Sequence, residues 1–336
     1  MQAADSARDI ARSLAHYRLS SPLRSVAELT VTAVPLLLVW LLTWIALRQG
    51  HFWLYPVTAL LAAGFLVRLF MIQHDCGHGA FFRTRRANDW VGRVIGVLTL
   101  TPYDYWRRTH AAHHAGSGNL DRRGMGDIET LTLALSKRDR FRYRLYRHPL
   151  VMFGLGPAYL FFVRNRLPFG LLRAGWGPWA SAMSTNVGIA ILAVAAIWLV
   201  GAGTFALLYV PVALLAASMG VWLFYVQHQF EETTWANDRA WSLHEAALHG
   251  SSHYDLPGIL AWFTANIGVH HIHHLASRIP YYRLPQVLRD HPEFRDVGRL
   301  TLLRSLGCVR LTLWDEDRKR LVRFRDVDAL VIGGCG

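Results

Sequence analysis

Two long stretches of this chain contain almost no charged side chain, and they constrain its fold more than any other feature. Between Arg173 and Glu231 the sequence has no Asp, Glu, Lys or Arg over 57 residues. Between Leu29 and Val67 the only charged residue is Arg48. A helix of about 20 apolar residues spans the hydrocarbon core of a bilayer, so each stretch has room for two spans.

Each stretch is interrupted by a short segment that is typical of a turn. "RQGH" at 48–51 divides the first stretch, and "VGAGTF" at 200–205 divides the second. Because glycine favours turns over helix interiors, each stretch is expected to fold as a helical hairpin. We therefore predict an all-α membrane protein with four transmembrane helices in two hairpins. The predicted spans lie near 29–47, 54–72, 183–200 and 204–226.

Three other segments are expected to lie at the membrane surface or inside the protein. The apolar runs 94–101 and 149–163 are too short to cross a bilayer. The N-terminal "DSARDIARSLAHYRLSS" at 5–21 lacks the apolar core of a signal peptide. Its pattern is typical of an amphipathic helix that lies in the membrane surface.

The basic residues predict the orientation of the hairpins. Apart from Arg48 and Arg68, every Lys and Arg falls within 1–28, 73–182 or 231–336. These segments lie on one side of the membrane if the spans pair as hairpins. The positive-inside rule makes that side cytoplasmic. We therefore expect a protein of a bacterial inner membrane with both termini on the cytoplasmic side.

The predicted hairpins divide the chain into five segments. They are an N-terminal amphipathic segment (1–28), a first transmembrane hairpin (29–72), a cytoplasmic cap segment (73–182), a second hairpin (183–226) and a second cap segment with the tail (227–336).

The composition narrows the classes of partner. The formal net charge is +13, yet only 18% of residues are charged and 52% are hydrophobic. No basic module stands apart from the membrane anchors, which argues against a nucleic-acid-binding protein. Attraction to anionic lipid head groups and to an acidic electron carrier explains the charge better. The three cysteines, Cys76, Cys308 and Cys335, form no CxxC pair, which favours a reducing compartment.

Histidines are concentrated at the predicted inner ends of the spans and in the cap. "HDCGH" at 74–78 has histidines at i and i+4, and "HAAHH" at 110–114 and "HHIHH" at 270–274 repeat the HxxHH spacing. One more histidine follows the fourth span. On helices these spacings bring imidazoles onto one face, which predicts metal binding. The nine candidate ligands are His74, His78, His110, His113, His114, His228, His270, His273 and His274.

The number of imidazoles favours a dinuclear metal site. A structural zinc site needs only four ligands, and Cys76 has no thiol partner. Imidazole also suits iron and copper, and nine nitrogens divide over two ions with positions left open for oxygen. This favours two iron ions, although ligand softness alone leaves other metals open. A metal transporter or sensor is the alternative, but transporters carry ionisable ligands within their spans, and these spans carry almost none.

Four sequence segments around the histidines carry a family resemblance. The chain resembles the integral-membrane fatty acid desaturases, most closely the bacterial branch related to acyl-lipid delta-12 (omega-6) enzymes, over about 25–300. The segments that carry the resemblance are "HDCGHGAFF" at 74–82, "HAAHHAGSGNLDRRGMGDIETLT" at 110–132, "YVQHQFEETTW" at 225–235 and "NIGVHHIHHLASRIPYYRL" at 266–284.

The resemblance implies a fold and a ligand set. It implies four long helices that hold a cytoplasmic helical cap with a histidine-ligated di-iron site, and the family pattern falls on the nine histidines named above. His271 adjoins His270, so either could be the first ligand of the third box, and the HxxHH spacing favours His270. The histidines expected to be non-ligands are His16, His51, His148, His244, His249, His253 and His291.

The resemblance also implies an activity. Dioxygen and two irons would remove two hydrogens from adjacent carbons of an acyl chain in fatty acid biosynthesis. No metal-independent catalytic residue is expected. The chain has no dinucleotide, haem or iron–sulfur motif, so electrons are expected from a ferredoxin or a cytochrome-b5-like carrier with its reductase. A hydroxylase or ketolase of the same superfamily remains the alternative, because the same metal site serves both.

Several polar and aromatic residues lie near the histidine boxes in the sequence. Carboxylates and amides near ligands could orient the imidazoles, or could be exposed side chains that offset nearby arginines. These candidates are Asp75, Asp127, Glu129, Glu231, Glu232, Asp255 and Asn266. Cys76 is expected to serve only in packing.

Aromatic residues near the boxes could line an apolar tunnel for the acyl chain, although most are expected in the core or in the interfacial belt. These aromatics are Phe81, Phe82, Trp90, Tyr103, Tyr105, Trp106, Trp222, Phe224, Trp262 and Phe263.

Overall fold

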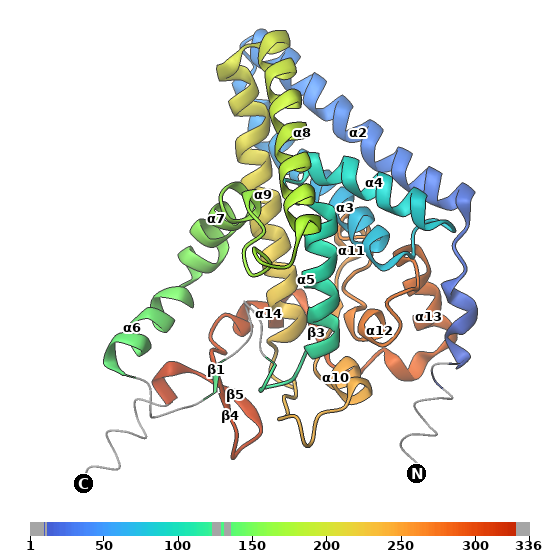
Figure 1. The fold of residues 1–336 in the computed structure, drawn as a ribbon, viewed down its shortest axis with the longest axis vertical. Coiled ribbons are helices and arrows are strands. Elements are labelled where there is room, and N and C mark those ends of the chain that lie inside the picture. Colours follow the sequence, from blue (N-terminus) through green and yellow to red (C-terminus); the bar gives the residue numbers. More distant parts are fainter. Residues whose placement is uncertain (1–9, 11, 123–128, 131–135, 327–336) are drawn as a thin grey trace.

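Four long helices dominate the molecule (Figure 1). The computed structural model describes residues 10, 12–122, 129–130 and 136–326. Each long helix has the length and apolar composition needed to cross a membrane, which confirms the four predicted spans. They are α2 (Pro22–Arg48), α3 (Tyr55–His78), α8 (Trp176–Val200) and α9 (Ala202–His228).

Glycines close both hairpins where the sequence predicted turns. α2 is followed by Gly50 at φ +81° and by the short 3₁₀ helix η2 (Phe52–Leu54). Gly201, at φ +85°, is the single residue between α8 and α9. Positive φ favours glycine because other side chains are strained there. The two tight turns therefore pair α2 with α3 and α8 with α9.

Two of the spans continue beyond their predicted inner ends. The second span was expected to end at 72, but α3 continues to His78. The fourth was expected to end at 226, and α9 continues to His228. The expectation that His74 and His78 share a helical face at i and i+4 is thereby confirmed.

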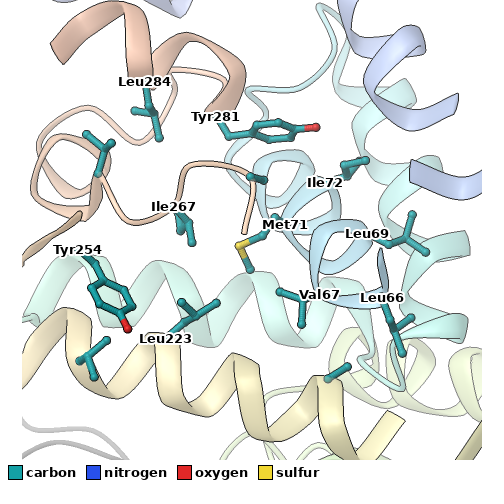
Figure 2. Close-up of a cluster of buried hydrophobic side chains, with 14 of the residues drawn as sticks. Leu66, Val67, Leu69, Met71, Ile72, Leu223, Tyr254, Ile267, Tyr281 and Leu284 are labelled. Carbon is teal, nitrogen blue, oxygen red and sulfur yellow. The ribbon is translucent and has the colours of Figure 1, made fainter. Parts of the chain in front are cut away.

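α3 lies at the centre of the molecule. Half of its most apolar segment is buried, whereas only 6% of the corresponding segment of α8 is buried. Side chains of α3 pack against α9 and the cap (Figure 2). This packing fixes the position of the α3 end that carries His74 and His78. The labelled side chains are Leu66, Val67, Leu69, Met71, Ile72, Leu223, Tyr254, Ile267, Tyr281 and Leu284.

A buried ion pair within the first hairpin also forms hydrogen bonds with the cap. Arg68 on α3 is only 1% exposed, and its guanidinium donates to the carboxylate of Glu28 and to Thr32 Oγ1 (3.1 Å) on α2. It also donates to the Trp262 carbonyl and lies over that indole ring. Tyr281 donates its hydroxyl to Glu28 Oε2 at 3.1 Å. An ionised side chain at this depth persists because it is fully partnered.

Shorter helices surround the inner ends of the long ones. α5 lies beside the lower part of α9, while α6 and α7 extend outward from α9 (Figure 1). The shorter helices are α4 (Arg85–Leu98), α5 (Tyr103–Gly116), α6 (Lys137–Tyr146), α7 (Gly156–Phe162), α10 (Leu243–His249), α11 (Gly258–Phe263), α12 (His270–Leu275), α13 (Leu284–Asp290) and α14 (Leu302–Cys308). Single turns are η1 (Ala15–Arg18), the π-helical η3 (Val151–Leu155), η4 (Arg164–Arg166), η5 (Tyr281–Arg283) and η6 (Pro292–Phe294).

Five very short strands supplement the helices, which the all-α prediction did not include. They form two small sheets among the described residues, one parallel pair and one three-stranded sheet with both parallel and antiparallel pairing. The strands are β1 (Glu129–Thr130), β2 (His253–Asp255), β3 (Arg299–Thr301), β4 (Leu313–Asp315) and β5 (Arg320–Val322). β2 matters for the site, because the Ser252 carbonyl before it accepts the backbone N–H of His270 at 3.2 Å.

The segments predicted at the membrane surface fold as follows. The run 94–101 forms the end of α4 and the loop after it, and 149–163 contains η3 and α7. The predicted amphipathic helix at 5–21 falls partly outside the described residues. Its described part contains η1 and buries Leu14 and Tyr17.

Candidate metal centre

Four helices bring the nine candidate ligands to one place below the spans. α3 ends with His74 and His78, and α9 ends with His228. α5 carries His110, His113 and His114, and α12 carries His270, His273 and His274. The ring nitrogens fall into two groups, and within each group the ligand atoms lie within 4.8 Å of one another. The arrangement is compatible with two metal ions.

The groups differ in number and in origin. The five-histidine group contains His74, His78, His110, His114 and His273. The four-histidine group contains His113, His228, His270 and His274. α5 and α12 contribute to both groups, because consecutive residues on a helix point about 100° apart. The adjacent pairs His113–His114 and His273–His274 are therefore divided between the two groups.

Separations between ring nitrogens fit a shared ion. His110 Nε2 lies 3.0 Å from the Nε2 atoms of both His74 and His78. In the other group, His228 Nε2 lies 3.1 Å from the Nε2 atoms of His113 and His270. Two nitrogens bound at right angles about 2.1 Å from one ion lie about 3.0 Å apart, and tetrahedral neighbours about 3.4 Å apart. His273 Nε2 lies 3.3 Å from His114 Nε2, so the separations cover the values for both geometries and fit nitrogens that share one ion.

Burial keeps these imidazoles neutral. Desolvation lowers the pKa values of His110, His113 and His270 well below the ordinary value, and neighbouring imidazoles lower them further. The pKa values of His114, His273 and His274 are lowered for the same reasons. A neutral imidazole offers the lone pair that a metal needs.

One buried nitrogen of the four-histidine group fits a bound metal. His274 Nε2 is buried, and no hydrogen-bond partner lies near it among the described residues. A buried polar atom without a partner is costly. Since this atom belongs to the four-histidine group, a bound cation would satisfy it. The donor set of the site thus fits a metal that imidazole prefers, such as iron.

Different partners orient the two groups. His74 Nδ1 lies 3.4 Å from Asp75 Oδ1, and Asp75 Oδ2 accepts the backbone N–H of Tyr281 at 2.7 Å. His228 Nδ1 lies 3.2 Å from the Gly250 carbonyl and 3.4 Å from Ser117 Oγ. A partner on Nδ1 directs Nε2 toward the metal position. Of the predicted orienting residues, Asp75 alone has such a contact in the described part of the chain.

The other predicted orienting residues do not contact the histidine groups as expected. Glu231 and Glu232 are exposed and lie 3.8 Å and 3.5 Å from Arg304. Asp255 pairs with Arg299 at 2.7 Å. Of the two alternatives open for these three carboxylates, the structure favours the exposed side chain that offsets a nearby arginine.

For the other residues proposed near the boxes, no contact with a histidine of either group is described. Asp127 and the Glu129 side chain lie outside what the structure describes, and the Glu129 backbone is in β1. Asn266 lies in a turn at φ +55°, and its backbone N–H donates to the Ala261 carbonyl. Cys76 is buried and belongs to neither group.

His271 has a structural environment distinct from that of His270. Its Nε2 lies 2.9 Å from the Phe294 carbonyl, which fits a donated N–H, and its ring lies 5.5 Å from that of His253. His270 lies in the four-histidine group and His271 does not. The geometry therefore favours His270 as the first ligand of the third box. The seven histidines expected to be non-ligands are also outside both groups.

Trp106 has a contact that was not among the predictions from the sequence. Its indole stacks on His110, with ring centroids 4.5 Å apart and an interplanar angle of 15°. Gly77 makes room for it, because a Cβ at Gly77 would lie 2.7 Å from the indole. Trp106 lies four residues before His110 on α5, so the i, i+4 spacing is the signal in the sequence that could have found this contact.

An apolar cavity of about 530 Å³ opens onto both groups. Its wall includes His74 and His110 from one group and His113 and His270 from the other. Most of the rest of the wall comes from the apolar faces of α3 and α9, from α5 and α7, and from the segments 98–101 and 164–171. Of the ten aromatics considered for a tunnel, the cavity is lined by Tyr105, Trp106 and Phe224. The others, such as the buried Phe81 and the exposed Trp90, lie elsewhere.

The fold and site define a helical membrane protein with a polyhistidine metal site that faces an apolar cavity. The chain belongs to the fatty acid desaturase family, because the family model described as "Fatty acid desaturase" matches residues 50–302. The "Fatty acid desaturase" of Bacillus subtilis (strain 168) is 41% identical over 324 residues, which cover 95% of this chain and 91% of that protein. These matches confirm the family resemblance and the prediction that the chain is an enzyme.

Two more distant relatives have more specific names. The "sn-1 acyl-lipid omega-3 desaturase (ferredoxin)" of Nostoc sp. (strain 36) is 27% identical, over 69% of this chain and 66% of that protein. The "sn-1 oleoyl-lipid 12-desaturase" of Anabaena variabilis is 24% identical, over 71% of this chain and 69% of that protein.

Proposed function

We propose that this protein is an O2-dependent desaturase that uses two iron ions to introduce a double bond into a lipid-linked acyl chain. We propose delta-12 (omega-6)-like selectivity. The nine histidines are the proposed iron ligands, with five on one ion and four on the other. The observation that carries this proposal is the cavity, since a single apolar space reaches both histidine groups.

The chain's own residues would hold and align the reactants. Bound iron supplies the oxidising power, drawn from dioxygen, that hydrogen removal from an unactivated carbon requires. Asp75 and the Gly250 carbonyl orient His74 and His228. The walls of α3 and α9 exclude water and hold the acyl chain in one path past the histidines. Such alignment determines which two carbons react.

The names of the relatives support an acyl-lipid substrate, and one of them supports the position. The Anabaena protein is named for position 12 of an oleoyl lipid, whereas the Nostoc protein is named as an acyl-lipid omega-3 desaturase. An acyl chain esterified in the bilayer also suits a cavity built against membrane-spanning helices. A new double bond in an already monounsaturated chain is therefore the expected product.

We further propose a separate electron carrier on the cytoplasmic side. The Nostoc relative is named with ferredoxin, and a ferredoxin or a cytochrome-b5-like protein with its reductase would serve here. The formal net charge of +13 favours docking of an acidic carrier. The positive-inside rule supports a bacterial inner membrane with both termini and the histidine groups in the cytoplasm.

Fatty-acid profiling tests the proposed function. The gene is expressed in a bacterial host whose lipids contain only saturated and monounsaturated chains, together with a ferredoxin and its reductase. The total fatty acids are derivatised to locate double bonds and analysed by gas chromatography–mass spectrometry. We expect a diunsaturated acid with its new bond at position 12, absent from a host that expresses His110→Ala.

Each other outcome has a defined meaning. A hydroxy or keto acid would assign the protein to the oxygen-inserting branch of the superfamily. A double bond at another position would retain the desaturase assignment and overturn the delta-12 selectivity. No product from a protein that binds two irons per chain and receives electrons would overturn the proposed activity on membrane acyl chains.

A further inference from the structure

Arg164 is an unusual side chain in the wall of the apolar cavity. Apart from the histidines, the charged residues that line the cavity are Arg122 and Arg164. Arg122 pairs with Asp238 at 2.9 Å and lies over the Trp241 ring. For the partly buried Arg164, no side-chain hydrogen bond or ion pair is present with any residue that the structure describes. A cation beside an apolar space is stabilised by an anion.

The neighbours of Arg164 hold it in this place. Asn165 donates Nδ2–H to the Leu100 carbonyl at 3.3 Å, and Arg166 donates to the same carbonyl. Arg166 also donates to Asn186 Oδ1 on α8 at 2.9 Å. The turn η4 is therefore anchored by the two residues that follow Arg164, while the Arg164 guanidinium has no partner among the described residues.

The surroundings of η4 are apolar. Exposed apolar side chains flank it in the chain, namely Tyr159, Val163, Leu167, Leu172 and Trp176. α7, which precedes η4, lies against the middle of α9 (Figure 1). An arginine in apolar surroundings extends its long side chain so that its charge reaches a polar or anionic group, such as a lipid head group.

Arg164 shares one cavity with residues of both histidine groups. The cavity wall contains Arg164 together with His74 and His110 of the five-histidine group and His113 and His270 of the four-histidine group. A molecule that fills this space can therefore contact the Arg164 guanidinium and the histidines at the same time.

We propose that Arg164 binds the phosphate of a membrane glycerophospholipid whose acyl chain occupies the cavity. Guanidinium and phosphate form paired, charge-assisted hydrogen bonds, so one arginine can both bind and orient a head group. Fixing the head at Arg164 determines how far along the chain the histidine groups act. This inference rests on the proposed function and specifies its lipid carrier.

The first test measures binding without turnover. Purified, iron-loaded full-length protein in detergent is titrated with palmitoyl-oleoyl-phosphatidylglycerol, and bound lipid is counted by native mass spectrometry. Arg164→Gln is expected to weaken binding about tenfold, whereas Arg164→Lys retains most of it. Arg173→Gln is the matched control, because Arg173 is exposed in the same connection and does not line the cavity.

Two further ligands identify the source of the phosphate. Diacylglycerol with the same acyl chains lacks phosphate, so wild type and Arg164→Gln should bind it equally. Oleoyl-coenzyme A should fail to displace the phospholipid from the wild type. Displacement at equal concentration, with loss of coenzyme A binding in Arg164→Gln, would reassign the site to a soluble thioester and overturn the lipid proposal.

The second test measures product in cells. Arg164→Gln should lower the new diunsaturated acid about tenfold at equal membrane expression, and part of the remaining product should carry its double bond at other positions. Equal binding and an equal product profile in wild type and Arg164→Gln would overturn this inference while leaving the desaturase proposal intact. Absence of product from wild type would contradict the proposed function, whatever the binding result.

Discussion

The five-histidine and four-histidine groups share two cap helices but differ in the membrane-spanning helix that completes each. α3 contributes His74 and His78 to the first group, and α9 contributes His228 to the second. α5 and α12 contribute to both. The relative position of the two proposed metal sites therefore depends on how the first and second hairpins pack together, which they do through contacts between α3 and α9.

The groups also differ in what holds their histidines in place. The first is oriented by a side-chain carboxylate, that of Asp75, and by the indole of Trp106 stacked on His110. The second is oriented by the Gly250 carbonyl and the Ser117 hydroxyl. A backbone carbonyl cannot be removed by substitution. The first group should therefore be the more sensitive of the two to mutation of its surroundings.

Replacing one ligand in either group should have the largest effect. His110→Ala and His113→Ala remove neighbouring α5 histidines from different groups. Each should lower product at least about 100-fold and iron from two ions per chain toward one, because the remaining imidazoles no longer complete a site. Iron is measured by elemental analysis and product by gas chromatography–mass spectrometry. His51→Ala, in the turn between α2 and α3, is the control, and full activity in either ligand variant would contradict the two-site arrangement.

Blocking the shared cavity tests whether both groups act on one acyl chain. Gly220 lines the cavity, and a Cβ built there meets no atom within 4 Å. Gly220→Leu should extend into this space and lower product from long chains about tenfold or more. Gly203→Leu on the same helix also has open space but does not line the cavity. If both variants match wild type in amount and chain length of product, the acyl chain follows another path.

A milder pair of substitutions compares the two kinds of orienting contact. Asp75→Asn removes the carboxylate beside His74 and should lower iron affinity or product about tenfold. Ser117→Ala leaves the Gly250 carbonyl near His228 and should reduce either quantity only about twofold. Iron titration followed by product analysis measures both. A larger loss in Ser117→Ala than in Asp75→Asn would reverse the proposed difference between the groups.

The last comparison measures how much bound metal contributes to stability in each group. A ligand that binds only the folded state adds about 2.7 kcal/mol at a free concentration of 100 times Kd. Chelation should lower the melting temperature of the detergent-solubilised wild type by several degrees, and that of His113→Ala by about half as much. An equal shift in both proteins would mean that the four-histidine group contributes no bound metal to stability.

Local patterns in the sequence predicted the membrane helices and the histidine boxes well. The uncharged stretch from Ala174 to Phe230 and the glycine-containing turns yielded the four spans, because hydrophobic length and turn preference are properties of contiguous residues. The i, i+3 and i+4 spacings likewise predicted which histidines share a helical face. The structure brings all nine candidate ligands together, as those spacings suggested.

Local patterns could not predict contacts between segments that are far apart in the sequence. Glu231 and Glu232 were considered beside His228 because they are close in sequence, but the fold turns them to solvent and Arg304. The environment of His271, against the Phe294 carbonyl, likewise depends on the packing of α12 against the chain that follows it.

The sequence by itself determined the four apolar helices, their turns and the residues available to bind metal, since these follow from composition and periodicity along the chain. Only the tertiary structure decided that the histidines divide into five and four, and that one cavity joins Arg164 to both groups. These features depend on the packing of α3, α5, α9 and α12, which are far apart in sequence. Their relative positions result from the burial of side chains in a shared core, which no local pattern specifies.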